Sequence, residues 1–116
     1  MCYNTKKTGI SPQKSDRRID MNPKLKNDEA ITELFKAIAT LENEEECAYF
    51  FEDLCSVAEL KAMAQRLQVA KLLKLDLPYN KIVDMTGAST ATISRVKRSF
   101  DYGEDGYMIA IKRLNK

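Results

Sequence analysis

Histidine is absent from this chain of 116 residues. Its absence removes the commonest general base and the commonest metal ligand, and with them most hydrolase triads and most zinc sites. The chain also lacks an apolar run near the roughly 20 residues that a membrane-spanning helix needs. Its polar start, MCYNTKK, has no secretion signal. We therefore expect a cytoplasmic protein that is not an enzyme, with no cofactor, no metal site and no membrane contact.

Cysteine is also scarce. The three cysteines, Cys2, Cys47 and Cys55, are odd in number and form no CxxC motif, which argues against a disulfide framework and a thiolate metal site. Cys47 and Cys55 fall within apolar helical pattern. We therefore expect reduced thiols, with these two serving as packing atoms.

Charge is strongly segregated although the net charge is only +2. Residues 1–27 carry 7 basic and 2 acidic groups, residues 28–53 carry 1 and 9, and residues 54–100 carry 8 and 3. The first block has no apolar periodicity, so we expect a disordered basic arm over 1–27 and one domain over 28–116. The basic later block would suit an anionic polymer, although ordinary solvated helix surface is the alternative.

From Asp28 onward the apolar residues recur at helical spacing, which predicts an all-α domain. The first stripe predicts a helix of about four turns and contains Ile31, Leu34, Phe35, Ile38 and Leu41. Asn43 and Glu46 resemble a capped start of a second helix, whose stripe is Cys47, Phe50, Phe51 and Leu54. Sustained period-two alternation is absent, so no strand is expected.

A third helix is predicted from a capping box at Ser56 and Glu59. Its apolar positions are too wide for one stripe, which indicates a central helix covered on more than one side: Leu60, Met63, Ala64, Leu67, Val69, Ala70, Leu72 and Leu73. The apolar load of the first two helices exceeds what so thin a helical array can bury. We therefore expect a homodimer in which a second copy covers Leu34, Phe35, Phe50 and Phe51.

Residues 77–100 read as a helix, a tight turn and a second helix. Pro78 suits a first helical turn, and Gly87 suits the left-handed position after a helix. Ser89 or Thr90 can cap the second helix. Its apolar face then consists of Ile93, Val96 and Phe100.

The opposite face of that second helix is small and basic. It carries Ala91, Ser94, Arg95 and Arg98, with Thr90 and Lys97 beside them. Short side chains let a helix approach base edges in the major groove, and longer basic ones reach phosphates or guanine. No acidic residue occurs from Met85 to Phe100, as a polyanionic duplex would require. Generic helix pairs with a glycine turn are common, so the turn alone is weak support.

Three segments carry a resemblance to a known family: Phe51–Cys55, Ala64–Leu67 and Thr86–Arg98. With the Ser56–Glu59 box, they make the chain similar to the Trp repressor family, and more closely to its YerC/YecD-type branch of small bacterial proteins. The resemblance implies six helices and an intertwined homodimer. Its paired recognition helices would enter successive major grooves, ~34 Å apart, and favour a palindromic operator.

The resemblance also implies which residues bind DNA. On the first helix these are Tyr79, Asn80 and Val83. The second helix contributes Ser89, Thr90, Ala91 and Ser94, while Lys97 and Arg98 replace small polar residues and add positive charge. To these we add Thr92 and Arg95 of the same helix as expected DNA-binding residues.

An effector pocket is implied by the same resemblance. Arg66 and Arg95 match two arginines that flank bound tryptophan, and Ser56 and Ser99 match hydroxyl positions of that pocket. Val96 stands where the repressor has a glycine, and its branched side chain would fill the space for the indole ring. This argues against tryptophan and favours another carboxylate between the arginines, which pair with it bidentately. Arg66 as a surface or salt-bridged residue, and operator binding without any effector, are the alternatives.

Two functions follow from the sequence. The first is a sequence-specific DNA-binding regulator that represses by occupying promoter DNA. The alternative is a helical protein-interaction module without specific DNA binding, in which the acidic block from Asp28 to Asp53 docks a basic partner.

Overall fold

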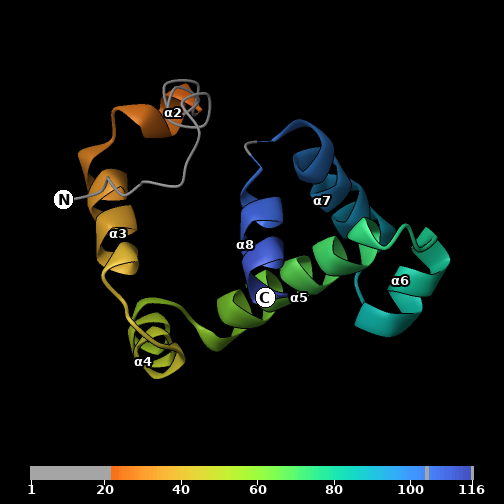
Figure 1. Cartoon of the computed structure of the whole chain (residues 1–116), viewed down its shortest axis with the longest axis horizontal. Coiled ribbons are helices and arrows are strands. Elements are labelled where there is room, and N and C mark those ends of the chain that lie inside the picture. The colour runs from red at the N-terminus through yellow and green to blue at the C-terminus, as the bar shows by residue number, and fades with distance from the viewer. Residues whose placement is uncertain (1–21, 104, 116) are drawn as a thin grey trace. The chain divides into compact units, whose positions relative to one another are not determined.

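The computed structural model describes residues 22–103 and 105–115. Within these ranges every regular element is a helix and no strand is present, which confirms the all-α prediction (Figure 1). The helices are α2 (Pro23–Lys26), α3 (Glu29–Ala39), α4 (Glu44–Leu54), α5 (Val57–Lys74), α6 (Tyr79–Thr86), α7 (Thr90–Tyr102) and α8 (Gly106–Leu114). Helices α3 to α8 are the six expected within residues 28–116.

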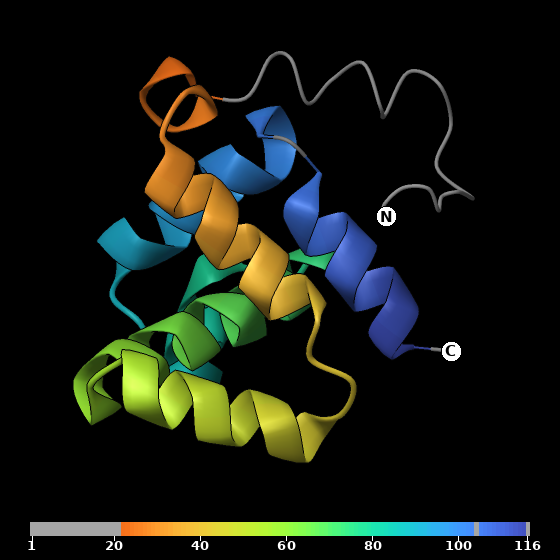
Figure 2. The ribbon, with the colours of Figure 1, turned by 90° about the vertical axis from the view of Figure 1, so that its left-hand side faces the viewer.

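The chain divides into two compact units, residues 1–47 and residues 48–116, and α4 spans their boundary. In the first unit, α2 is a single turn that precedes α3 (Figure 2). Its start is capped because the side chain of Asn22 accepts a hydrogen bond of 2.9 Å from the Lys24 amide. This turn lies in the segment where no structure was expected, while residues 1–21 of the expected basic arm lie outside the described residues.

Helix α3 begins where the sequence placed it. Asp28 accepts a hydrogen bond of 3.1 Å from the Ile31 amide, as an N-cap residue does. The helix has 11 residues, about three turns instead of the expected four, and Leu41 lies beyond its end. Thr40 closes the last turn by donating its hydroxyl to the Ala37 carbonyl at 2.6 Å. None of the α3 residues is buried.

Helix α4 has the predicted capped start. The Glu46 amide donates to Asn43 Oδ1 at 2.8 Å. Phe50 and Phe51 meet edge to face with ring centroids 5.6 Å apart, yet no residue of α4 is buried. Cys47 and Cys55 are half-buried and form no disulfide with each other, and Cys2 falls outside the described part of the chain.

The second unit is organised around α5. Both bonds of the predicted capping box are present, with Ser56 Oγ accepting from the Glu59 amide at 3.1 Å and Glu59 Oε1 accepting from the Ser56 amide at 2.8 Å. Helices α6, α7 and α8 all pack against α5, which confirms that it is covered on several sides (Figure 1).

The core of this unit is small. Its buried residues are Val69, Ala70, Leu73, Ile82, Ala88, Ile93, Val96 and Ile111. Full burial of a Val or Ile side chain stabilises a fold by about 1.5–3 kcal/mol. The core therefore fixes α6 and α7 against α5. No helix of the described ranges is long and apolar enough to cross a bilayer.

Candidate nucleic-acid interface

The turn between α6 and α7 has the glycine geometry that the sequence predicted. Gly87 has a φ of 75° and donates its amide to the Val83 carbonyl at 2.8 Å. Thr86 Oγ1 donates to the Ile82 carbonyl at 2.7 Å and accepts from the Ala88 amide at 3.1 Å. These bonds satisfy the backbone of the turn, and buried Ala88 anchors it in the core.

Ser89 is the residue that caps α7. Its Oγ accepts from the Thr92 amide at 3.1 Å and donates to Thr92 Oγ1 at 3.0 Å. Of the two caps that the sequence allowed, Thr90 is instead the first helical residue. Pro78 occupies the corresponding place before α6, one residue ahead of the first turn expected for it.

Helix α7 has two chemically distinct faces. Ile93 and Val96 are buried and Phe100 is half-buried against the core. The remaining positions from 90 to 98, except half-buried Thr92, are exposed: Thr90, Ala91, Ser94, Arg95, Lys97 and Arg98. The face proposed to read DNA therefore points away from the core, and it offers short polar side chains followed by cationic ones.

The predicted residues of α6 lie at different depths. Tyr79 and Asn80, at its first turn, are exposed. Val83 is half-buried and packs against the core, so it contributes to the fold as well as to any contact. Ser89, at the tip of the turn, is exposed.

A hydrogen bond that the sequence did not predict connects α5 to the turn between α6 and α7. Gln65 Nε2 donates to the Thr86 carbonyl at 3.3 Å. This carbonyl belongs to the last turn of α6, where intrahelical partners run out. Gln65 therefore connects α5 directly to the end of α6, next to the turn that leads to α7.

Arg66 and Arg95 do come together. They line a shallow pocket of about 210 Å³ between α5 and α7, together with Ala62, Gln65, Ala91 and Thr92. Neither guanidinium forms an ion pair within the described part of the chain. Arg66 is half-buried, which makes it less accessible than a freely solvated surface residue.

Three other residues expected at this pocket do not line it. Ser56 is engaged as the cap of α5, and Ser99 lies farther along α7, where its carbonyl accepts from the Gly103 amide at 2.8 Å. Val96, which was expected to fill the indole space, is buried in the core and does not line this pocket.

One ion pair lies at the C-terminal half of α7. Lys97 Nζ and Asp101 Oδ2 are 2.8 Å apart, one helical turn from each other. The hydrogen bond to Asp101 raises the pKa of Lys97, so the ammonium stays charged. The i, i+4 spacing of the two residues was the available signal for this pair. Among the described residues, no cluster of three or more candidate ligands could hold a metal ion.

Comparisons with known proteins agree with this geometry. The family model of the Trp repressor protein matches residues 29–115. The uncharacterised protein YerC of Bacillus subtilis (strain 168) is 49% identical over 86 residues, which span 74% of this chain and 83% of YerC.

Two crystal structures are similar to the chain. One, from Staphylococcus aureus and provisionally named a Trp repressor, is 54% identical with a TM-score of 0.73, and the match covers 77% of this chain and 89% of that one. The other, a TrpR-like protein from Eubacterium eligens ATCC 27750, is 47% identical with a TM-score of 0.76, covering 81% and 96%. The resemblance seen in the sequence is thereby confirmed.

Proposed function

This chain belongs to the Trp repressor family, and from that premise we propose that it is a sequence-specific DNA-binding regulator that represses transcription by occupying promoter DNA. One observation carries the proposal. The outward face of α7 is exposed, rich in short side chains at its start and cationic at Arg95, Lys97 and Arg98, while its inward face is locked in the core. Such a helix can enter a major groove without disturbing the fold.

We further propose that two copies act together. Helices α3 and α4 contain no buried residue. In the second unit, Val57 at the start of α5 is 70% exposed and Leu54 is 49% exposed. A two-fold partner would remove these apolar side chains from water. Paired α7 helices would then read a palindrome whose half-sites lie about 10 base pairs apart, centre to centre.

The pocket between α5 and α7 supports an effector with a carboxylate group. Arg66 and Arg95 offer two guanidinium groups without an acidic partner among the described residues, and such forks bind carboxylates bidentately. Because Arg95 also lies on α7, an occupant would change the charge and position of a groove-facing side chain. Binding of DNA without an effector is the competing form of the proposal.

Selection of bound fragments from a random duplex library tests the proposal, with one arm containing a panel of amino acids. We expect enrichment of a palindrome, an affinity that falls linearly on a log-log plot against salt, and a cost of about 1–3 kcal/mol for each wrong base pair. Enrichment only in the amino-acid arm would establish an effector. A library that emerges unenriched in both arms would contradict sequence-specific binding.

The protein-interaction alternative has a specific observation in its favour. Glu44, Glu45 and Glu46 all lie exposed at the first turn of α4, with Glu52 and Asp53 exposed farther along. A basic protein retained from lysate, together with an unenriched duplex library, would favour that function instead.

A further inference from the structure

The stretch of α7 without acidic residues ends at Asp101, whose carboxylate forms an ion pair with Lys97. No Asp or Glu occurs from Met85 to Phe100, and the next residue is Asp101. Its Oδ2 lies 2.8 Å from Lys97 Nζ, which puts the two groups in direct hydrogen-bond contact. Both side chains are exposed, at 45% for Lys97 and 36% for Asp101, so each is accessible to a ligand in solution.

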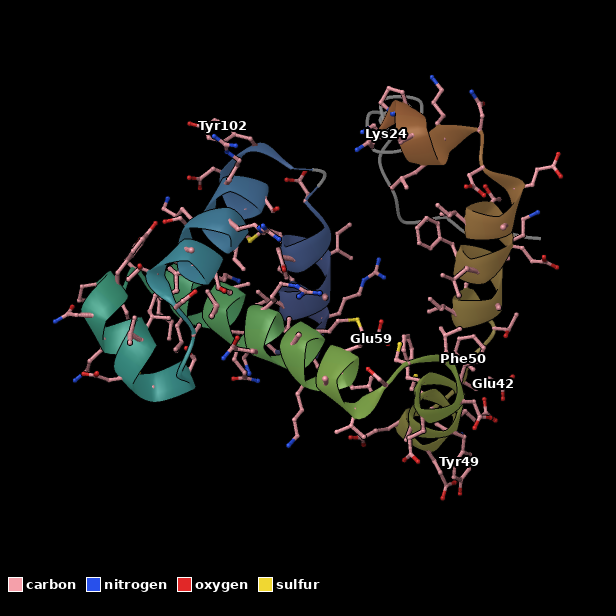
Figure 3. All side chains as sticks on the ribbon, turned by 180° about the vertical axis from the view of Figure 1, so that it is seen from behind. Lys24, Glu42, Tyr49, Phe50, Glu59 and Tyr102 are labelled. Carbon is pink, nitrogen blue, oxygen red and sulfur yellow. The ribbon has the colours of Figure 1, made fainter. Side chains whose placement is uncertain are left out.

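Lys97 lies at the border of the proposed DNA-facing surface. Thr90, Ser94 and Asp101 lie on the same side of the helix, since residues three to four apart share a face. The exposed Tyr102 follows Asp101 at the end of α7 (Figure 3). The ammonium therefore lies near the last turn of α7.

We propose that Asp101 is an affinity-limiting residue for DNA, because it holds the Lys97 ammonium and competes with phosphate for it. This inference rests on the proposed function. A lysine paired with a carboxylate must exchange that partner before it can contact a phosphate. The ion pair therefore keeps the affinity for DNA below the value that the basic side chains of α7 would give without Asp101.

Removing the carboxylate has a calculable effect. The observed binding constant varies with salt to a power of about −0.9 for each phosphate contact on B-DNA. Each gained contact therefore multiplies the binding constant by about 15 at 0.05 M salt and by about 4 at 0.2 M, when its contribution is taken as zero at 1 M, and a dimer that gains one contact in each protomer applies this factor twice. The log-log salt slope steepens by about 0.9 per protomer.

The test compares Asp101→Asn with the wild-type protein on a duplex that the wild type has selected from the random library. Asp101→Asn should bind more tightly and with the steeper slope, by the amounts above. Asp53→Asn removes the same charge from exposed α4 and is the matched control, expected to change affinity by less than twofold. Far-ultraviolet circular dichroism of each variant confirms that the helices are retained.

A double-mutant cycle decides whether Asp101 acts through Lys97. The gain from Asp101→Asn should vanish when it is made in a Lys97→Gln background. A gain that persists there, or an Asp101→Asn variant with wild-type affinity and slope, would overturn the inference while leaving the proposed function intact. A wild-type protein that selects no duplex would overturn the proposed function itself.

Discussion

Gly87 is the residue on which the geometry of the turn between α6 and α7 depends most directly. Its φ of 75° lies in the left-handed region, and a Cβ placed there would meet no atom within 4 Å beyond Gly87 itself and its two neighbours in the chain. The cost of Gly87→Ala is therefore one of backbone conformation, about 1–2 kcal/mol. Urea unfolding followed by circular dichroism should show this loss.

Gly106 provides the matched control for that measurement. It is the first residue of α8, and a Cβ there also has open space, but its φ is not positive. Gly106→Ala should leave stability unchanged or raise it slightly, because alanine favours helices. Equal losses in the two variants would contradict the role assigned to the turn.

Glu59 gives the fold a pH dependence with a definite sign. The Ser56 backbone amide, and then the Ser56 hydroxyl, hydrogen-bond its carboxylate and hold the pKa of Glu59 below 4.5. Because the folded pKa is depressed, this stabilisation is present above the unfolded pKa and is lost as the pH falls through the folded value.

An NMR titration of the Glu59 carboxyl resonance checks this directly. The midpoint should lie below 4.5 in the wild type and move toward 4.5 in Ser56→Gly, which lacks the hydroxyl. A Glu59 midpoint that stays the same in both proteins would show that the Ser56 hydroxyl does not stabilise the ionised carboxylate.

At the scale of single residues the sequence was informative wherever the signal was local. The Ser56–Glu59 box, the Asn43 cap and the left-handed Gly87 were all predictable because each depends on neighbours within four residues. Gln65 was not, since its acceptor, the Thr86 carbonyl, lies 21 residues away. Contacts of that kind require the packing of α5 against α6, which no sequence spacing encodes.

At the scale of helices, Gln65 should determine how stably α6 and α7 are attached to α5. Gln65→Ala removes the hydrogen bond to the Thr86 carbonyl and should cost about 0.5–1.5 kcal/mol. Amides of α6 and α7 should then exchange faster with solvent, because the turn between them has lost its direct connection to α5. Hydrogen exchange measured by NMR reports each helix separately.

Gln68, exposed on the same helix, is the control for that substitution. Gln68→Ala should leave exchange in α6 and α7 at the wild-type rate. If Gln65→Ala and Gln68→Ala behave alike, the bond to Thr86 does not support the turn between α6 and α7.

Helix boundaries show where the sequence pattern misleads. The apolar stripe predicted about four turns for α3, but the helix ends at Ala39, and Leu41 belongs to the following turn. Apolar spacing continues through Leu41 because that side chain is also partly buried, outside the helix. Helix α8 was not located from the sequence, and its N-cap residue, Asp105, has a φ of 67° and makes no side-chain capping hydrogen bond.

At the scale of the whole molecule, the proposed homodimer makes a prediction about size in solution. Analytical ultracentrifugation of the wild type should give a mass of two chains. Val57→Asp should shift the protein toward one chain, because it would bury a charge in the interface. Val57 is the first residue of α5, where an acidic side chain is favourable to the helix itself, so the loss would not reflect unfolding of α5.

Leu75 supplies the control for the interface. It is 68% exposed, close to the 70% of Val57, but it lies at the opposite end of α5, where the chain leads into α6. Leu75→Asp should remain a dimer. A wild-type protein that sediments as one chain at all concentrations would contradict the proposed pairing of two α7 helices.

The most direct test of the account is the dissociation constant of Arg98→Ala for the selected duplex, measured beside Arg113→Ala. Arg98 lies on the outward face of α7, and Arg113 is an exposed arginine on α8. The account predicts a loss of about five- to 150-fold for Arg98→Ala, equivalent to 1–3 kcal/mol, and less than a twofold change for Arg113→Ala. Equal affinities for both variants and the wild type would contradict the claim that α7 reads DNA.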